Sequence, residues 1–208
     1  MKRFIVGLTG ASGSILAYTV IQKLLENGHE VHFVASKLGE RVMAYELERS
    51  FSEILNHFKK NPSFFHHDNE NLFASISSGS YLVDAMCIVP CSMGTLGKIA
   101  GGISDSLICR AADVTLKERR PLVLVTRETP LSGIHLENML KLTRYGATIM
   151  PPVPAYYNKP KTVDEIVVQS SSRILRTLGV IIDEYKVWSG DESPLGSDDL
   201  GKLGEFDA

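Results

Sequence analysis

The feature that most constrains the fold is an apolar run near the amino terminus that ends in a turn of small residues. The run extends from Arg3 to Thr9, the turn is Gly10-Ala11-Ser12-Gly13, and a helical pattern begins directly after it. In a first β-α unit of this kind, backbone N–H groups at the start of the helix bind an anion. The unit therefore predicts an α/β protein that binds a phosphate group.

The spacing of the glycines argues against a dinucleotide. Gly7, Gly10 and Gly13 form G-x-x-G-x-x-G, whereas the dinucleotide pattern is G-x-G-x-x-G. The expected second strand, 30–35, is followed by Ser36-Lys37 and not by the acidic residue that would hold a ribose diol. We therefore predict a nucleotide-like phosphate and disfavour an NAD-dependent oxidoreductase.

Apolar strands alternate with helical patterns along the chain, which favours a Rossmann-like, doubly wound parallel sheet in a single domain, residues 1–188. The residues after that domain, 189–208, carry six acids and one lysine, which is typical of a mobile tail. Strands are expected at 3–8, 30–35, 84–89, 122–126 and 147–150. Helices are expected at 12–27, 37–48, 51–58, 92–100, 104–119, 132–145 and 162–178, with a loop over 61–71.

The composition sets limits on function. The chain has 208 residues, 44% of them apolar, and a net charge of −2, which argues against sequence-independent binding of nucleic acid. It has no apolar run of membrane-spanning length and no signal-peptide pattern. Cys87, Cys91 and Cys109 are interpreted as buried free thiols, and together these features predict a cytoplasmic protein.

No metal site is predicted. His66 and His67 are adjacent, so their side chains point apart, and they are interpreted as loop residues without acidic partners. Asp198-Asp199 lacks the paired aspartate-rich pattern that binds magnesium diphosphate.

Polar or reactive groups follow four of the expected strands, where ligands bind in an open parallel sheet. They are Thr9 to Ser12, Ser36, the segment from Cys91 to Thr95, and Arg127-Glu128. Ser12, Ser36 and Ser92 could each act as a helix cap instead of a ligand contact. Arg127-Glu128 could be a structural ion pair, although its place at a strand end favours a functional role.

Further along the chain, charged and aromatic groups offer a second set of candidates. Arg110, Asp113 and Lys117 share one helical face, as either a solvated ladder of ion pairs or part of a site. Tyr157 follows a proline-rich turn and could line an aromatic pocket or an interface. Arg173 lies among the serines 170–172, a setting that suits a phosphate.

Several motifs, in this order, resemble those of the flavin prenyltransferase (UbiX-type) family, formerly described as aromatic acid or polyprenyl-hydroxybenzoate decarboxylases. The resemblance extends from about residue 2 to Trp188 and is loose over 50–72. The motifs are Gly10-Ala11-Ser12-Gly13, Pro90-Cys91-Ser92-Met93-Gly94-Thr95-Leu96, Arg110-Ala111-Ala112-Asp113-Val114, Leu116-Lys117-Glu118, Val125-Thr126-Arg127-Glu128, Ile134-His135-Leu136-Glu137-Asn138-Met139-Leu140 and Pro154-Ala155-Tyr156-Tyr157-Asn158.

The resemblance implies an enzyme that joins the dimethylallyl group of dimethylallyl monophosphate to N5 and C6 of reduced FMN, without a metal. The product, prenyl-FMN, would serve a partner decarboxylase, and relatives are homododecamers with sites shared between subunits. The implied FMN contacts are Gly10, Ala11, Ser12, Ser36, Ser92, Met93, Gly94, Thr95 and Arg127. The implied prenyl-phosphate contacts are Arg110, Lys117, Tyr157, Arg173 and Trp188. The implied catalytic groups are Glu128, which transfers a proton, together with Glu46, Ser12 and Lys117.

Two other functions fit part of the pattern. A flavin-dependent peptidyl-cysteine decarboxylase has the same fold but uses a Pro-x-Met-Asn-type loop, where this chain has Pro154-Ala155-Tyr156-Tyr157-Asn158. A non-catalytic flavin-binding protein would not need Glu128, Lys117 and Arg173 together.

Overall fold

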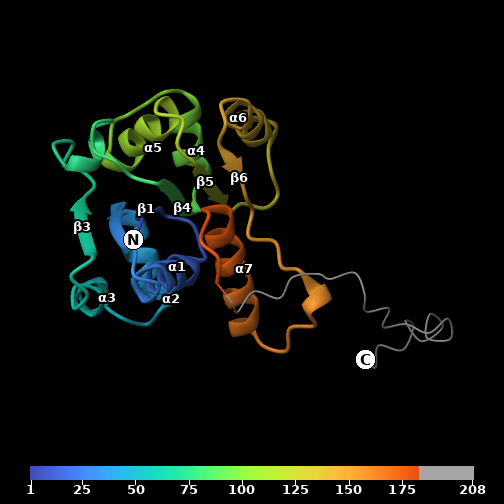
Figure 1. Cartoon of the computed structure of the whole chain (residues 1–208). Coiled ribbons are helices and arrows are strands. Elements are labelled where there is room, and N and C mark those ends of the chain that lie inside the picture. The colour runs from blue at the N-terminus through green and yellow to red at the C-terminus, as the bar shows by residue number, and fades with distance from the viewer. Residues whose placement is uncertain (183–208) are drawn as a thin grey trace.

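The computed structural model describes residues 1–182, which form a parallel sheet between two layers of helices (Figure 1). The strand order is β3-β2-β1-β4-β5-β6, and each neighbouring pair is parallel. The strands are β1 (Arg3–Leu8), β2 (Glu30–Ala35), β3 (Phe64–Asp68), β4 (Ala85–Cys91), β5 (Leu122–Thr126) and β6 (Thr148–Ile149). The predicted Rossmann-like, doubly wound fold is confirmed. Trp188 and the acidic segment 189–208 lie outside the described residues.

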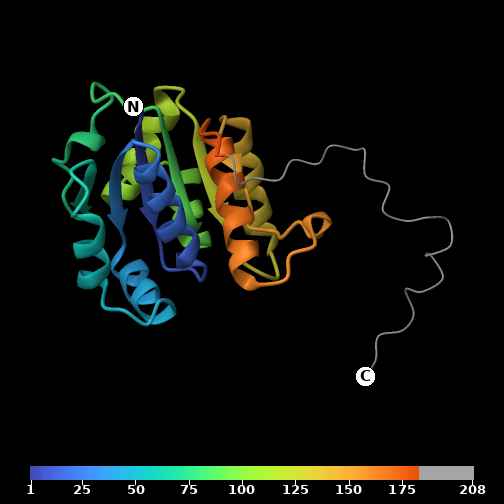
Figure 2. The ribbon, with the colours of Figure 1, turned by 60° about the horizontal axis from the view of Figure 1, so that its bottom comes forward.

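The helices follow the predicted pattern, with ends that differ by a few residues. Figures 1 and 2 show α1 and α7 on one face of the sheet and α4, α5 and α6 on the other. Their bounds are α1 (Ser14–Glu26), α2 (Lys37–Glu46), α3 (Phe51–Phe58), α4 (Met93–Ala100), α5 (Leu107–Lys117), α6 (Gly133–Arg144) and α7 (Val163–Thr177), with short 3₁₀ turns η1 (Ser75–Ser77) and η2 (Tyr156–Asn158). No helix within residues 1–182 is long and apolar enough to cross a bilayer.

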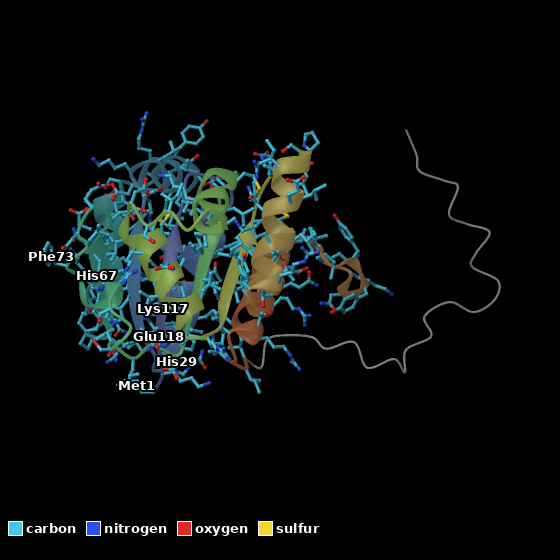
Figure 3. All side chains as sticks on the ribbon, turned by 90° about the horizontal axis from the view of Figure 1, so that it is seen from above. Met1, His29, His67, Phe73, Lys117 and Glu118 are labelled. Atoms are coloured by element: carbon cyan, nitrogen blue, oxygen red, sulfur yellow. The ribbon has the colours of Figure 1, made fainter. Side chains whose placement is uncertain are left out.

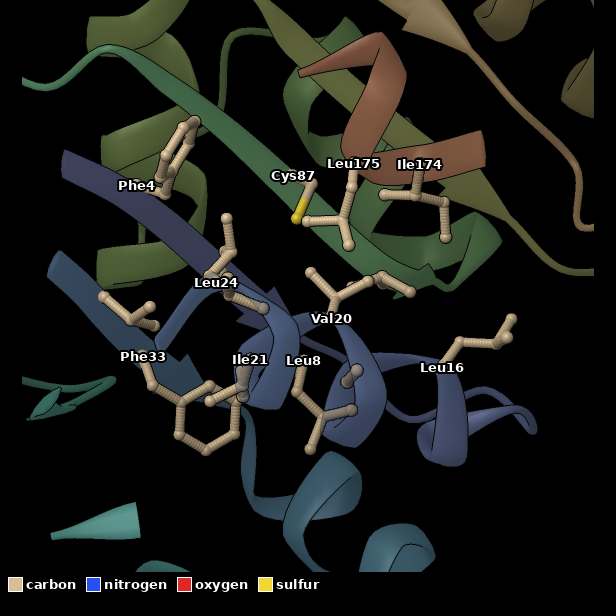
Figure 4. Packing of buried hydrophobic residues seen from close by; sticks show 14 of the residues in the cluster. Phe4, Leu8, Leu16, Val20, Ile21, Leu24, Phe33, Cys87, Ile174 and Leu175 are labelled. Atoms are coloured by element: carbon tan, nitrogen blue, oxygen red, sulfur yellow. The ribbon is translucent and has the colours of Figure 1, made fainter. Parts of the chain in front are cut away.

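The sheet is buried on both faces, which explains why its central strands are continuous apolar runs. Phe4 and Leu8 of β1 pack with Leu24 of α1 and Leu175 of α7, as Figure 4 shows, while Ile5 belongs to the cluster on the opposite face. The three cysteines are buried and free, as predicted.

The predicted loop over 61–71 is wrong, because it contains β3, the strand at one edge of the sheet. Its sequence includes His66, His67 and Asp68, which hides the strand pattern. His67 is accommodated by pairing, since its Nε2 lies 2.7 Å from Nδ1 of His32 on β2, and His66 packs against the rings of Phe33 and Phe51. The strand expected at 84–89 extends to Cys91, so Pro90 lies within β4.

Candidate functional site

The chain reverses its direction of winding between β1 and β4. β2 lies on one side of β1 and β4 on the other, which makes this the topological switch point where ligands bind in such sheets. A cavity of about 400 Å³ opens at the carboxyl ends of the strands here. It is lined by Thr9, Ser36, Asn69, Glu70, Ser92, Gly94, Thr95, Lys98, Asp105, Ser106, Ile108 and Cys109.

Thr9 joins the ends of β1 and β4 beneath this cavity. Its hydroxyl donates to the carbonyl of Pro90 at 2.8 Å and accepts the backbone N–H of Ser92 at 2.8 Å. Thr9 is 2% exposed, so both hydrogen bonds form away from water. The threonine therefore fixes the turn that carries Ser92 relative to the first strand.

Ser36 and Ser92 are helix caps that also line the cavity. The Ser36 hydroxyl accepts the N–H of Gly39 at 3.1 Å, and the Ser92 hydroxyl accepts that of Thr95 at 3.3 Å. Capping is thus confirmed for both serines, and contact with a ligand stays a prediction. Because the caps place the N-termini of α2 and α4 beside one cavity, two partial positive charges face it.

The N-terminus of α1 is occupied differently from the prediction. Gly13 is its N-cap, with φ of 104°, and supplies no capping side chain. Both carboxylate oxygens of Glu46 accept the N–H of Gly13 at 3.1 Å, and one accepts the N–H of Ser14 at 2.8 Å. Ser12 is therefore not the cap.

Glu46 is held as an anion. Partial burial acts to raise the pKa of its carboxyl, but hydrogen bonds from Ser12, Ser14 and Gly13 outweigh burial and lower that pKa below the ordinary value. The amides of Gly13 and Ser14 therefore already bind a carboxylate, whereas the N-termini of α2 and α4 lie beside the cavity.

The far wall of the cavity holds Cys109 and three residues that the sequence analysis did not single out, Lys98, Asp105 and Asn69. Lys98 Nζ lies 2.7 Å from Asp105 Oδ2. Burial raises the pKa of the Cys109 thiol, which keeps it protonated and unreactive.

Asn69, which also lines the cavity, follows β3, so the sequence analysis missed it together with that strand. The signal that could have found it is a further strand end at the same edge of the sheet.

A second cavity, of about 330 Å³, lies between α7 and the segment that follows β6. Tyr157 and Arg173 line it, together with Pro151, Pro152 and Gln169. The structure thus brings together two of the predicted prenyl-phosphate contacts. Ser170 also lines this cavity, whereas Ser171 and Ser172 are buried in the protein.

Arg110 and Lys117 lie elsewhere, on α5, across the sheet from α7. Arg110 donates to the carbonyl of Ser77 at 3.1 Å and pairs with Asp113 at 2.8 Å. Lys117 forms an ion pair with Glu118, and Figure 3 shows the two labels side by side. One chain therefore does not bring these cations to Tyr157 and Arg173.

Arg127 and Glu128 follow β5 and are both exposed. The backbone N–H of Arg127 donates to the carbonyl of Cys91 at 3.2 Å, which ties this strand end to β4. A Glu128 oxygen accepts the N–H of Thr129 at 3.0 Å. Within residues 1–182 no ion pair joins Arg127 to Glu128, and the single chain does not shield Glu128 from water.

Of the predicted FMN contacts, the first cavity gathers Ser36, Ser92, Gly94 and Thr95. Gly10, Ala11, Ser12, Met93 and Arg127 do not line it, although all of them lie at the same edge of the sheet. A Cβ at Gly10 would collide with the side chain of Leu38, so the turn needs glycine there. No group of three or more His, Cys, Asp or Glu side chains in residues 1–182 could hold a metal ion.

Comparison with known proteins adds independent evidence. A family described as Flavoprotein matches residues 1–175. Flavin prenyltransferase UbiX of Chlamydia muridarum is 47% identical over 190 residues, which cover 90% of this chain and 98% of that protein.

Two solved structures have the same fold at comparable identity. AnUbiX (PadA1), in complex with FMN and dimethylallyl pyrophosphate, is 43% identical with a TM-score of 0.86, covering 92% of this chain and 99% of that one. A dodecameric FMN-dependent UbiX-like decarboxylase from Escherichia coli O157:H7 is 44% identical with a TM-score of 0.83, covering 90% of this chain and 100% of that one.

Proposed function

The chain belongs to the flavin prenyltransferase family, and from that premise we propose that it transfers a dimethylallyl group from dimethylallyl monophosphate to N5 and C6 of reduced FMN. The product is prenyl-FMN, which a partner decarboxylase uses as its cofactor. The observation that carries this proposal is the cavity at the switch point, where hydroxyl groups from separate strand ends converge beside two helix N-termini.

The cavity suits a flavin phosphate. Its volume of about 400 Å³ lies in the range of cofactor pockets. The hydroxyls of Ser36, Ser92 and Thr95 can donate to phosphate oxygens, and the N-termini of α2 and α4 favour the negative charge. Gly10, Ala11, Ser12, Met93, Gly94 and Arg127 would contact the rest of the flavin, which supplies the nucleophilic atoms when it is reduced.

The prenyl phosphate would lie against Tyr157 and Arg173. As the allylic carbon–oxygen bond breaks, negative charge grows on the phosphate, and nearby cations stabilise it without a metal. Because Arg110 and Lys117 lie on the opposite face of the sheet, we propose that a second copy of the chain supplies them. Trp188 would also contact the substrate at this shared site, and it lies outside the described residues.

Proton transfer is assigned to Glu128, at the end of β5. A second copy that covers the exposed strand end would exclude water there, which helps a carboxyl group exchange a proton with the flavin. Glu46 and Ser12 are the other catalytic groups in this proposal, and Glu46 is held at the first turn by the N–H and hydroxyl of Ser14.

The test is the mass of the flavin after anaerobic incubation with reduced FMN and dimethylallyl monophosphate. A gain of one C5H8 unit supports the proposal, and an unchanged flavin rejects it. A parallel incubation with the diphosphate identifies the preferred donor.

A peptidyl-cysteine decarboxylase activity is the second candidate. It shares the fold, but the similarity to a flavin prenyltransferase extends over nine-tenths of this chain, and the segment Pro154-Ala155-Tyr156-Tyr157-Asn158 differs from the Pro-x-Met-Asn-type loop of those decarboxylases. Release of CO₂ from a peptide with a C-terminal cysteine would favour that candidate.

A further inference from the structure

The segment that carries Tyr157 projects from the body of the protein between β6 and α7, as Figure 2 shows. Tyr156 is 71% exposed and Tyr157 is 42% exposed, so burial of apolar surface does little to fix this segment. Something else must hold it at a defined distance from α7 if Tyr157 is to act together with Arg173.

Gln169 of α7 makes that connection. Its Nε2 donates to the carbonyl of Ala155 at 2.9 Å, and its Oε1 accepts the N–H of the same residue at 3.1 Å. One side-chain amide thus satisfies both backbone groups of Ala155 and fixes its orientation as well as its distance.

We call these two hydrogen bonds between Gln169 and Ala155 the Gln169 clamp. The position of Ala155 determines what the clamp holds in place. Ala155 is the N-cap of η2, the turn that contains Tyr157, so fixing Ala155 fixes where the turn begins. Gln169 lies four residues before Arg173 on α7, which places both on one face of the helix. Gln169, Tyr157 and Arg173 all line the cavity of about 330 Å³.

We propose that Gln169 is a positioning residue for the prenyl-phosphate site. It holds the Tyr157 turn against the helix face that presents Arg173, and this assignment rests on the function proposed above. Binding both the N–H and the carbonyl of Ala155 requires a donor and an acceptor on one side chain of this length. Glutamate would place a carboxylate against the Ala155 carbonyl, and leucine would leave both backbone groups unpaired.

The first experiment compares Gln169→Leu with the wild-type protein. We expect KM for dimethylallyl monophosphate to rise about tenfold, the loss expected for one well-formed hydrogen-bonded contact, with kcat and FMN affinity nearly unchanged. Gln22→Leu is the matched control, since Gln22 also makes a side-chain hydrogen bond, to Glu26 on α1. An unchanged KM, or an equal loss of FMN affinity, would overturn the proposal.

Gln169→Glu supplies a readout that a loss of packing would not give. A protonated carboxyl has one donor and one acceptor, so it can replace the amide, whereas a carboxylate cannot. The KM of this variant relative to wild type should fall as the pH is lowered from about 7 to about 5. A ratio that stays constant over this range contradicts the clamp.

Hydrogen exchange at the Ala155 amide tests the hydrogen bonds of Gln169 independently of whether the protein makes prenyl-FMN. The Ala155 amide should exchange faster in Gln169→Leu than in wild type or Gln22→Leu, whether or not prenyl-FMN forms. Faster exchange in a protein that makes no prenyl-FMN would reject the activity and keep the clamp. Equal exchange would reject the clamp.

Discussion

The carboxylate of Glu46, at the end of α2, caps the N-terminus of α1 by accepting the backbone N–H of Ser14 at 2.8 Å and its hydroxyl at 2.5 Å. The cap comes from a residue 32 positions away, so it joins two helices as well as satisfying the free amides. It also places an anion at the small-residue turn, so we expect a phosphate to bind at the N-termini of α2 and α4.

Glu46→Gln should destabilise the protein by about 1 kcal/mol, the usual cost of weakening an N-cap. The folded-state pKa of Glu46 is lowered below its ordinary value of 4.5, so the ionised carboxylate stabilises the fold above that pH. This contribution is lost as the pH falls from 4.5 through the lower folded-state pKa. Urea unfolding should therefore show a difference between wild type and variant that shrinks on acidification, and a constant difference would contradict this account.

Thr9→Val should weaken FMN binding and destabilise the fold by about 1–3 kcal/mol, because the buried N–H of Ser92 loses its acceptor. Thr9→Ser keeps the hydroxyl and should bind FMN nearly as wild type does. Flavin fluorescence titration and thermal unfolding measure the two effects. Equal FMN affinities for the valine and serine variants would show that the hydrogen bonds of the Thr9 hydroxyl do not position the turn that carries Ser92 for FMN binding.

Glu128→Gln should bind FMN normally but form prenyl-FMN at least 100-fold more slowly, the scale of a lost general acid or base. Glu137→Gln, an exposed change on α6, is the control for an altered surface charge. Both variants are assayed by the mass of the flavin over time. Wild-type turnover by Glu128→Gln would remove this residue from the chemistry.

The sequence predicted the parts of the fold that rest on local pattern. The apolar runs of β1, β2 and β5 fit the observed strands because each is buried on both faces. β3 was missed because an edge strand needs less apolar surface, and its His67 pairs with His32, a contact that no local pattern reveals.

In the candidate site, too, some residues could be predicted from local pattern and others could not. Ser36, Ser92 and Thr95 follow strands directly, so their convergence could be predicted from the rule for parallel sheets. The Glu46 cap and the Gln169 clamp depend on contacts between distant segments. The separation of Arg110 from Arg173 depends on which face each helix covers, which follows from the strand order together with right-handed crossovers.

The most direct test of the central claim, a prenyl-phosphate site assembled from two copies, is turnover by mixed oligomers of Lys117→Ala and Arg173→Ala chains. Each variant alone should be nearly inactive with dimethylallyl monophosphate while it still binds FMN. In oligomers co-expressed with two different tags and purified through both, about a quarter of the sites should combine an intact Lys117 from one copy with an intact Arg173 from another. Prenyl-FMN formation at about that fraction of the wild-type rate is the predicted result. Mixed oligomers as inactive as either parent would contradict the shared site.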